Sequence, residues 1–235
     1  MHLTSTGLIE SRSRAQALIL AGRVKVSGET VRNPDRTVRD DDVVTVDESP
    51  GYASRGALKL IPALDTFGVD PTGRICADIG ASTGGFTDVL LRRGAAKVYA
   101  LDVGRGLLHW RLRQDPRVVV IERVNARELT AFPEAVDLAV IDVSFISLEK
   151  ILPAVRTAAP QAEVVVLFKP QFEVGRADVG KGGIVRNPTA IEAAVMSFRR
   201  WCATNGYTVK GEASSEVAGA EGNREIFFHL LPERA

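Results

Sequence analysis

The second half of the chain contains three short runs of consecutive apolar residues, and these runs restrict the folds that the chain can adopt. They span residues 118–121, 138–141 and 164–168. A strand that is apolar at every position is typical of a parallel sheet, because helices cover both faces of such a sheet. The segments between the runs are long enough for the crossover helices that parallel strands require. The pattern therefore predicts a doubly wound, Rossmann-like α/β sheet.

Further elements of the same domain are expected on both sides of these runs. Apolar residues at helical spacing predict a helix at residues 56–67, and another helix is expected to begin at Gly84. Four more strands are predicted at residues 76–79, 98–101, near 207–209 and 226–230.

The first 47 residues follow a different pattern, which predicts a small separate α+β module. An Ala- and Leu-rich stretch at residues 15–21 favours a helix that Gly22 ends. Short alternating stretches predict strands at residues 24–26 and 43–46. The Pro-Gly pair that follows is typical of a linker. The predicted boundaries are a module at residues 1–47, a linker at 48–53 and the doubly wound domain at 54–235.

The charge balance and the cysteine content exclude several classes of protein. The chain of 235 residues carries 30 basic and 29 acidic residues, so a uniformly basic nucleic-acid coat is excluded, although a local basic face is not. Its two cysteines are too few for a disulfide framework or a Cys-based zinc site, and no metal site is predicted. We find neither a signal-peptide pattern nor an apolar stretch near the ~20 residues of a membrane span, and we expect a cytoplasmic protein.

A glycine-rich loop at residues 80–85 joins the strand that contains Asp78 to the following helix. Such a loop lets a ligand approach main-chain N–H groups at the carboxyl edge of the sheet. Asp102 ends the next strand, where a carboxylate can accept hydrogen bonds from both ribose hydroxyls of a nucleoside. The glycine spacing differs from the G-x-G-x-x-G pattern of dinucleotide sites, so the features favour a nucleoside cofactor of another kind. A tight turn with only a structural role is the alternative.

Two charged residues follow apolar strands and are therefore expected at the same edge of the sheet. Asp142 follows the run at residues 138–141, and Lys169 follows the run at 164–168. Burial disfavours the charged form of a lysine, which makes Lys169 a candidate for proton transfer. The alternatives are a helix cap for Asp142 and a solvent-exposed strand end for Lys169.

Four separated motifs occur in an order that resembles one known family. The motifs lie at residues 54–60, 80–87, 144–147 and 169–175. They are similar to those of the TlyA family, ribosomal RNA 2′-O-methyltransferases that were historically labelled hemolysin A. The resemblance implies an FtsJ-like catalytic domain that uses S-adenosylmethionine, preceded by an alpha-L RNA-binding domain of the S4 type. The family has an additional helix before residue 7, so we expect the first module to lack that helix or the true start to lie upstream.

The family's site residues carry over to matching positions of this chain. Without the resemblance, Lys59 and Glu225 read as ordinary exposed residues of a helix and a strand. The implied Lys-Asp-Lys-Glu catalytic tetrad is Lys59, Asp142, Lys169 and Glu225. The implied cofactor-binding residues are Asp78, Gly80, Ser82, Gly84, Gly85, Phe86, Asp102 and Asn125.

RNA contacts are expected from two places. The first is the basic edge of the amino-terminal module together with the motif at residues 54–60. The second is an arginine series near Trp110, which is available to stack on a base. The family acts on cytidines of large-subunit and, in some members, small-subunit ribosomal RNA, so ribosomal subunits are the expected partners, and the oligomeric state stays open. The RNA-binding candidates are Arg12, Arg14, Arg23, Lys25 and Arg55, and the arginine series is Arg105, Arg111, Arg113, Arg117, Arg123 and Arg127.

Three other functions remain as alternatives. A nicotinamide-dependent oxidoreductase could use a similar sheet, but the glycine spacing disfavours it. A pore-forming cytolysin would match the historical label, but the sequence lacks a membrane span and a strongly amphipathic basic helix. An RNA-binding protein without catalysis is disfavoured because all four tetrad positions are intact.

Overall fold

The computed structural model describes residues 2–9, 11–20, 22–39, 41–46, 51–219 and 222–233. The chain divides after Gly51 into two compact units, each of which is described by itself. Unit 1 consists of α1 (His2–Ser5), α2 (Arg12–Leu20), β1 (Val24–Val26), β2 (Glu29–Val31) and β3 (Val44–Val46).

Unit 1 is an antiparallel sheet of order β2-β1-β3 with helices packed against it. The predicted helix and the two predicted strands are present, whereas α1 and β2 were not expected. Its small core includes Leu3 of α1 and Ala15 of α2, both packed with Val24. A short helix therefore does precede α2, within the part of the chain that the structure describes.

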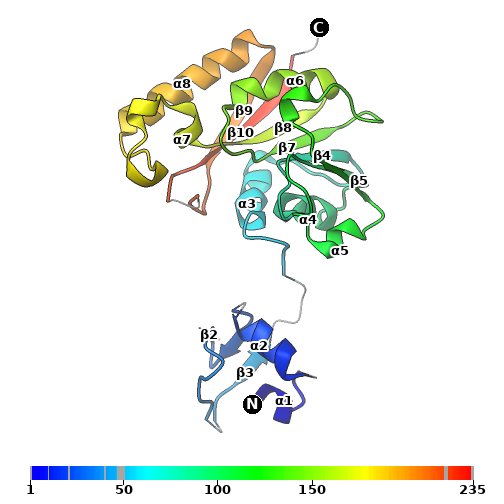
Figure 1. Ribbon diagram of the computed structural model, residues 1–235, viewed down its shortest axis with the longest axis vertical. Coiled ribbons are helices and arrows are strands. Elements are labelled where there is room, and N and C mark those ends of the chain that lie inside the picture. Colours follow the sequence, from blue (N-terminus) through cyan, green and yellow to red (C-terminus); the bar gives the residue numbers. More distant parts are fainter. Residues whose placement is uncertain are drawn as a thin grey trace. The chain divides into compact units, whose positions relative to one another are not determined.

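Unit 2 contains a seven-stranded sheet of order β6-β5-β4-β7-β8-β10-β9 (Figure 1). The predicted doubly wound fold is confirmed. Its parallel strands are β6, β5, β4, β7 and β8, in that order from one edge of the sheet. Strand β10 runs antiparallel to both β8 and β9. The strands are β4 (Ile75–Ile79), β5 (Lys97–Asp102), β6 (Val118–Glu122), β7 (Leu138–Ile141), β8 (Glu163–Phe168), β9 (Tyr207–Ser214) and β10 (Ile226–Pro232).

Helices cover both faces of this sheet, which explains the continuous apolar runs at residues 138–141 and 164–168. One core layer lies between the sheet and α3 and α4, and the other lies between the sheet and α6 and α8. The helices are α3 (Ala57–Phe67), α4 (Gly85–Arg92), α5 (Trp110–Arg113), α6 (Leu152–Ala158), α7 (Pro170–Glu173) and α8 (Pro188–Thr204), and the short 3-10 segments are η1 (Ala126–Glu128), η2 (Leu148–Lys150), η3 (Arg176–Asp178) and η4 (Lys181–Gly183).

The order of the strands reverses between β4 and β7, and this reversal determines where a ligand can bind. Strands β5 and β6 extend to one side of β4, and β7 and β8 extend to the other. Crossover connections therefore leave in opposite directions from β4 and β7, and a crevice opens beyond their carboxyl ends. Every candidate residue that follows β4, β5, β7 or β8 is brought to this edge.

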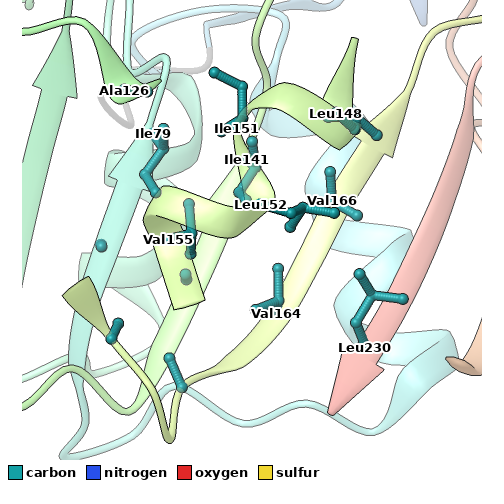
Figure 2. Close-up of a cluster of buried hydrophobic side chains, with 14 of the residues drawn as sticks. Ile79, Ala126, Ile141, Leu148, Ile151, Leu152, Val155, Val164, Val166 and Leu230 are labelled. Atoms are coloured by element: carbon teal, nitrogen blue, oxygen red, sulfur yellow. The ribbon is translucent and has the colours of Figure 1, made fainter. Parts of the chain in front are cut away.

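The layer under α6 is a suitable place to test how packing stabilises unit 2. Leu152 is fully buried and packs over β7 and β8 near Ile141 and Val166 (Figure 2). We expect Leu152→Ala to lower the free energy of unfolding by about 2–5 kcal/mol, because it leaves a cavity in a close-packed layer. Urea titration should give a lower midpoint with an unchanged slope. Leu58→Ala, at a half-exposed position of α3, is the control and should change stability by less than about 1 kcal/mol.

Candidate active site

The glycine loop after β4 is held against β7 by a contact that leaves no room for a side chain. Gly80 has φ +86°, and a Cβ atom there would lie 2.3 Å from the carbonyl oxygen of Asp142. Its N–H donates to the carbonyl of Leu101 at the end of β5. The loop is therefore fixed between two strand ends. Gly84, with φ +94°, lies against Leu112 in the same close manner.

Asp78 is the most deeply buried acid at this edge. Its side chain is fully buried, and Oδ2 accepts hydrogen bonds from the N–H and the hydroxyl of Thr87. Its Oδ1 has no hydrogen-bond partner among the described residues. Burial raises the pKa of Asp78 to about 7, and the nearby carboxylate of Asp142 adds to the rise. A buried carboxylate oxygen without a partner is suited to receive a cationic or hydrogen-donating ligand group.

Asp102 ends β5, and its carboxylate accepts hydrogen bonds from the backbone of two loops. Its Oδ2 accepts from the N–H of Ser82 at 2.8 Å, and its Oδ1 accepts from the N–H of Gly104 at 2.7 Å. Each carboxylate oxygen can accept a second hydrogen bond, so the side chain can still bind ribose hydroxyls. Asn125 caps η1 by accepting from the N–H of Arg127.

Two lysine–carboxylate ion pairs lie at the same edge of the sheet. Lys59 Nζ is 2.6 Å from Glu225 Oε2, and Lys169 Nζ is 2.6 Å from Asp142 Oδ1. Glu225 and Lys169 are buried, with 2% and 8% of their surface exposed. The simple expectation of solvent-exposed residues is therefore wrong for Lys59, Lys169 and Glu225. Asp142 is not a helix cap either, since Ser147 caps η2.

Two adjoining cavities contain most of the predicted residues. The Lys59 cavity, of about 280 Å³, is lined by Lys59, Asp78 and Asp142 together with residues of the glycine loop. The Asn125 cavity, of about 380 Å³, is lined by Asp102, Asn125 and Ser144, and it shares Gly80, Ser82 and Asp142 with the first. Together they have the size of a site for a small molecule.

The eight predicted cofactor residues and the tetrad relate to these cavities in different ways. All cofactor candidates except Gly84 line one of the two cavities. Lys169 and Glu225 do not line either cavity but bind residues that do. Lys59 and Asp142 line the same cavity, and each forms an ion pair with one of the other two tetrad residues. The structure thus brings all four tetrad residues together.

Sequence reasoning missed two residues, one that contacts Lys169 and one that holds the segment after Ser144. The Ser144 hydroxyl lies 2.9 Å from Lys169 Nζ, and Glu173 Oε1 accepts from the N–H of Leu148 at 2.9 Å. Burial raises the pKa of Glu173 to about 7, although its hydrogen bonds with Leu148 and Ser147 oppose the rise. Both residues lie inside the family motifs at residues 144–147 and 169–175. Their place in these motifs was the one feature of the sequence that could have pointed to them.

The expected RNA-binding residues fall in both units. In unit 1, Arg12 lies in α2, Arg23 directly precedes β1 and Lys25 is exposed on β1. Arg14 belongs to α2, but its side chain lies outside the described part of the structure. In unit 2, Arg55 is exposed and lines the Lys59 cavity.

Half of the arginine series is bound to acids rather than free for RNA. Three ion pairs form with acids of the same unit, at Asp88, Asp115 and Glu122. Trp110 itself is two-thirds exposed and stacks on His109. The expectation that the whole series faces RNA therefore needs correction for the arginines in these pairs, which are Arg111, Arg113 and Arg117.

The described residues contain no group of three or more His, Cys, Asp or Glu side chains that could hold a metal ion. Within the same ranges, we find no helix whose length and apolar character would suffice to cross a membrane.

Comparison with known proteins places this geometry among methyltransferases. The model of the FtsJ-like methyltransferase family matches residues 52–231, and the S4 domain model matches residues 3–44. The chain is 48% identical to the 16S/23S rRNA (cytidine-2′-O)-methyltransferase TlyA of Mycobacterium tuberculosis, over 97% of this chain and 87% of that protein. It is 42% identical to Hemolysin A of Brachyspira hyodysenteriae, over 98% of each chain. A Streptococcus thermophilus protein solved under the hemolysin name superposes with a TM-score of 0.77 at 40% identity, over 99% of this chain and 87% of that one.

Proposed function

The chain belongs to the TlyA family of FtsJ-like methyltransferases, and from this premise we propose that it methylates the ribose 2′-hydroxyl of cytidine in ribosomal RNA. The observation that carries the proposal is the convergence of two lysine–carboxylate pairs on one cavity at the carboxyl edge of the sheet. A hydroxyl becomes a good nucleophile only as its proton leaves, and this site holds amine groups beside a small-molecule cavity.

S-adenosylmethionine is the methyl donor that the fold and the family imply, and the two cavities fit it. The unpartnered Oδ1 of Asp78 suits its ammonium group. Asp102 has lone pairs left for its ribose hydroxyls, and Asn125 lines the cavity on the adenine side. When bound, it would supply an electrophilic methyl group on a sulfonium. The carboxylate of Asp142 lines both cavities, where it would face that positive charge.

Lys169 is proposed to take the proton of the 2′-hydroxyl at its Nζ. The amine becomes an ammonium as the proton arrives, and the carboxylate of Asp142 at 2.6 Å stabilises that charge. Such proton transfer contributes about 10²–10⁴-fold to the rate. Positioning of the hydroxyl for in-line attack supplies further acceleration.

The second pair, Lys59 and Glu225, is proposed to hold the ribose. Lys59 Nζ uses one N–H for Glu225 and lines the cavity, so its other N–H groups can donate to sugar oxygens. Glu225 is buried and fixes the lysine in that direction.

Unit 1 is proposed to bring the ribosomal RNA to the enzyme. The S4 match covers the residues that carry Arg12, Arg14, Arg23 and Lys25, and these side chains would contact phosphates. Arg55 lines the Lys59 cavity on an exposed loop, where it would contact the RNA near the reacting nucleotide.

The proposal is tested by methylation of ribosomes from a strain that lacks this gene. We expect the purified protein and S-adenosylmethionine carrying a labelled methyl group to label the RNA of intact subunits. Digestion to nucleosides should place the label in 2′-O-methylcytidine. Label on a base, or label on no RNA at all, would contradict the proposal.

The alternative functions gain no support from these observations. The glycine loop belongs to an FtsJ-like match rather than to a dinucleotide-binding pattern. The hemolysin name is a historical label within a family of RNA methyltransferases.

A further inference from the structure

We propose that Ser144 is a positioning residue that fixes the direction in which Lys169 accepts the proton. The inference rests on the proposed methyl transfer and concerns a hydroxyl outside the Lys-Asp-Lys-Glu set. The Ser144 hydroxyl lies 2.9 Å from Lys169 Nζ and at the wall of the Asn125 cavity.

The number of hydrogen atoms on the amine explains why a second partner matters. A neutral lysine amine has two N–H groups and one lone pair. Asp142 Oδ1 lies 2.6 Å from Nζ but accepts no hydrogen bond from it among the described residues, so this ion-pair contact alone leaves the amine free to rotate about the Cε–Nζ bond. The hydrogen bond from Nζ to the Ser144 hydroxyl fixes one N–H and thereby restricts the directions that the lone pair can take. The ion pair and this hydrogen bond together therefore orient the group that must meet the substrate hydroxyl.

Ser144 occupies this position because the segment that follows is tied to α7. Phe145 has φ +65°, and its ring packs on Phe172 with centroids 5.2 Å apart. The N–H of Leu148 donates to Glu173. Lys169 directly precedes α7, and Phe172 and Glu173 belong to α7. Residues 169–173 therefore carry both the amine and the two contacts that hold the segment of Ser144.

An ordinary structural role does not account for Ser144. Ser147 caps η2, and the backbone of the segment is held by Glu173 rather than by Ser144. Within the described residues, the hydrogen bond recorded for the Ser144 hydroxyl is the one with Lys169. Removal of this hydroxyl should therefore leave the backbone of residues 144–148 in place and let the Lys169 amine rotate.

The test compares Ser144→Ala and Ser144→Thr with the wild type in ribosome methylation. We expect Ser144→Ala to lower kcat by about ten-fold, the worth of one hydrogen bond to a chargeable group, with KM for RNA and for S-adenosylmethionine nearly unchanged. Ser144→Thr keeps the hydroxyl and should restore most of kcat. Ser197→Ala, at an exposed position of α8, is the matched control and should behave as the wild type.

The pH–rate profile separates positioning from simple damage to the loop. Loss of an acceptor destabilises the ammonium form, so the ascending limb of the Ser144→Ala profile should move to lower pH. An unchanged kcat, a threonine variant as slow as the alanine variant, or a limb that does not move would each overturn the inference. A wild type that methylates no RNA would instead refute the proposed function, which keeps the two failures distinct.

Discussion

Lys169→Ala is expected to lower kcat for RNA methylation by about 10²–10⁴-fold, because the variant has no group to take the 2′-hydroxyl proton. Lys169 is buried and its Nζ contacts Asp142 and Ser144 rather than the cavity itself. Affinity for S-adenosylmethionine, measured by calorimetry, should therefore stay within a few-fold of the wild type. Single-turnover methylation of ribosomes would report the loss at the chemical step.

Lys169→Arg distinguishes proton transfer from a role of charge alone. A guanidinium stays protonated at every pH at which the protein is folded, so it can pair with Asp142 but cannot accept a proton. We expect the arginine variant to be nearly as slow as the alanine variant. Lys150→Ala removes an exposed lysine of η2 and serves as the control for loss of a positive charge. Normal turnover by either Lys169 variant would remove this residue from the mechanism.

The central sheet could be predicted because its strands have a distinctive local composition. Runs such as residues 138–141 are apolar throughout, and only coverage of both faces explains this. The orientation of β10 could not be predicted, because it depends on pairing with β8 and β9 rather than on the residues of β10. The short elements α1 and β2 gave no periodic signal over their few residues.

The site was predictable where chemistry follows directly on a strand. Asp142 and Lys169 each end an apolar run, so their position at the carboxyl edge follows from the topology. Lys59 and Glu225 have no such context, since their pairing joins residues 166 positions apart. Only the family resemblance pointed to them. Ser144 was missed for the same reason, because its partner belongs to another strand end.

Gly80→Ala is expected to impair both stability and catalysis, because the added Cβ would meet backbone rather than a movable side chain. The nearest atoms are the carbonyl oxygen and carbon of Asp142, at 2.3 and 2.9 Å. The N–H of Asp142 donates to the carbonyl of Ile79, so this backbone is held in place by the end of β4. Relief of the clash must therefore displace Asp142, which positions Lys169.

The alanine at position 80 is expected to suffer both backbone strain and the clash with Asp142, and Gly68→Ala measures the strain alone. Gly68 also has positive φ, at +65°, but a Cβ there would meet nothing within 4 Å. Its alanine variant should lose about 1 kcal/mol of stability through backbone strain and keep full activity. Gly80→Ala should lose more stability in urea titration and about 10²-fold in kcat/KM, since a shift of about 1 Å at a catalytic carboxylate is that costly. If Gly80→Ala kept full activity, contact between the glycine loop and Asp142 would not be what positions this carboxylate against Lys169.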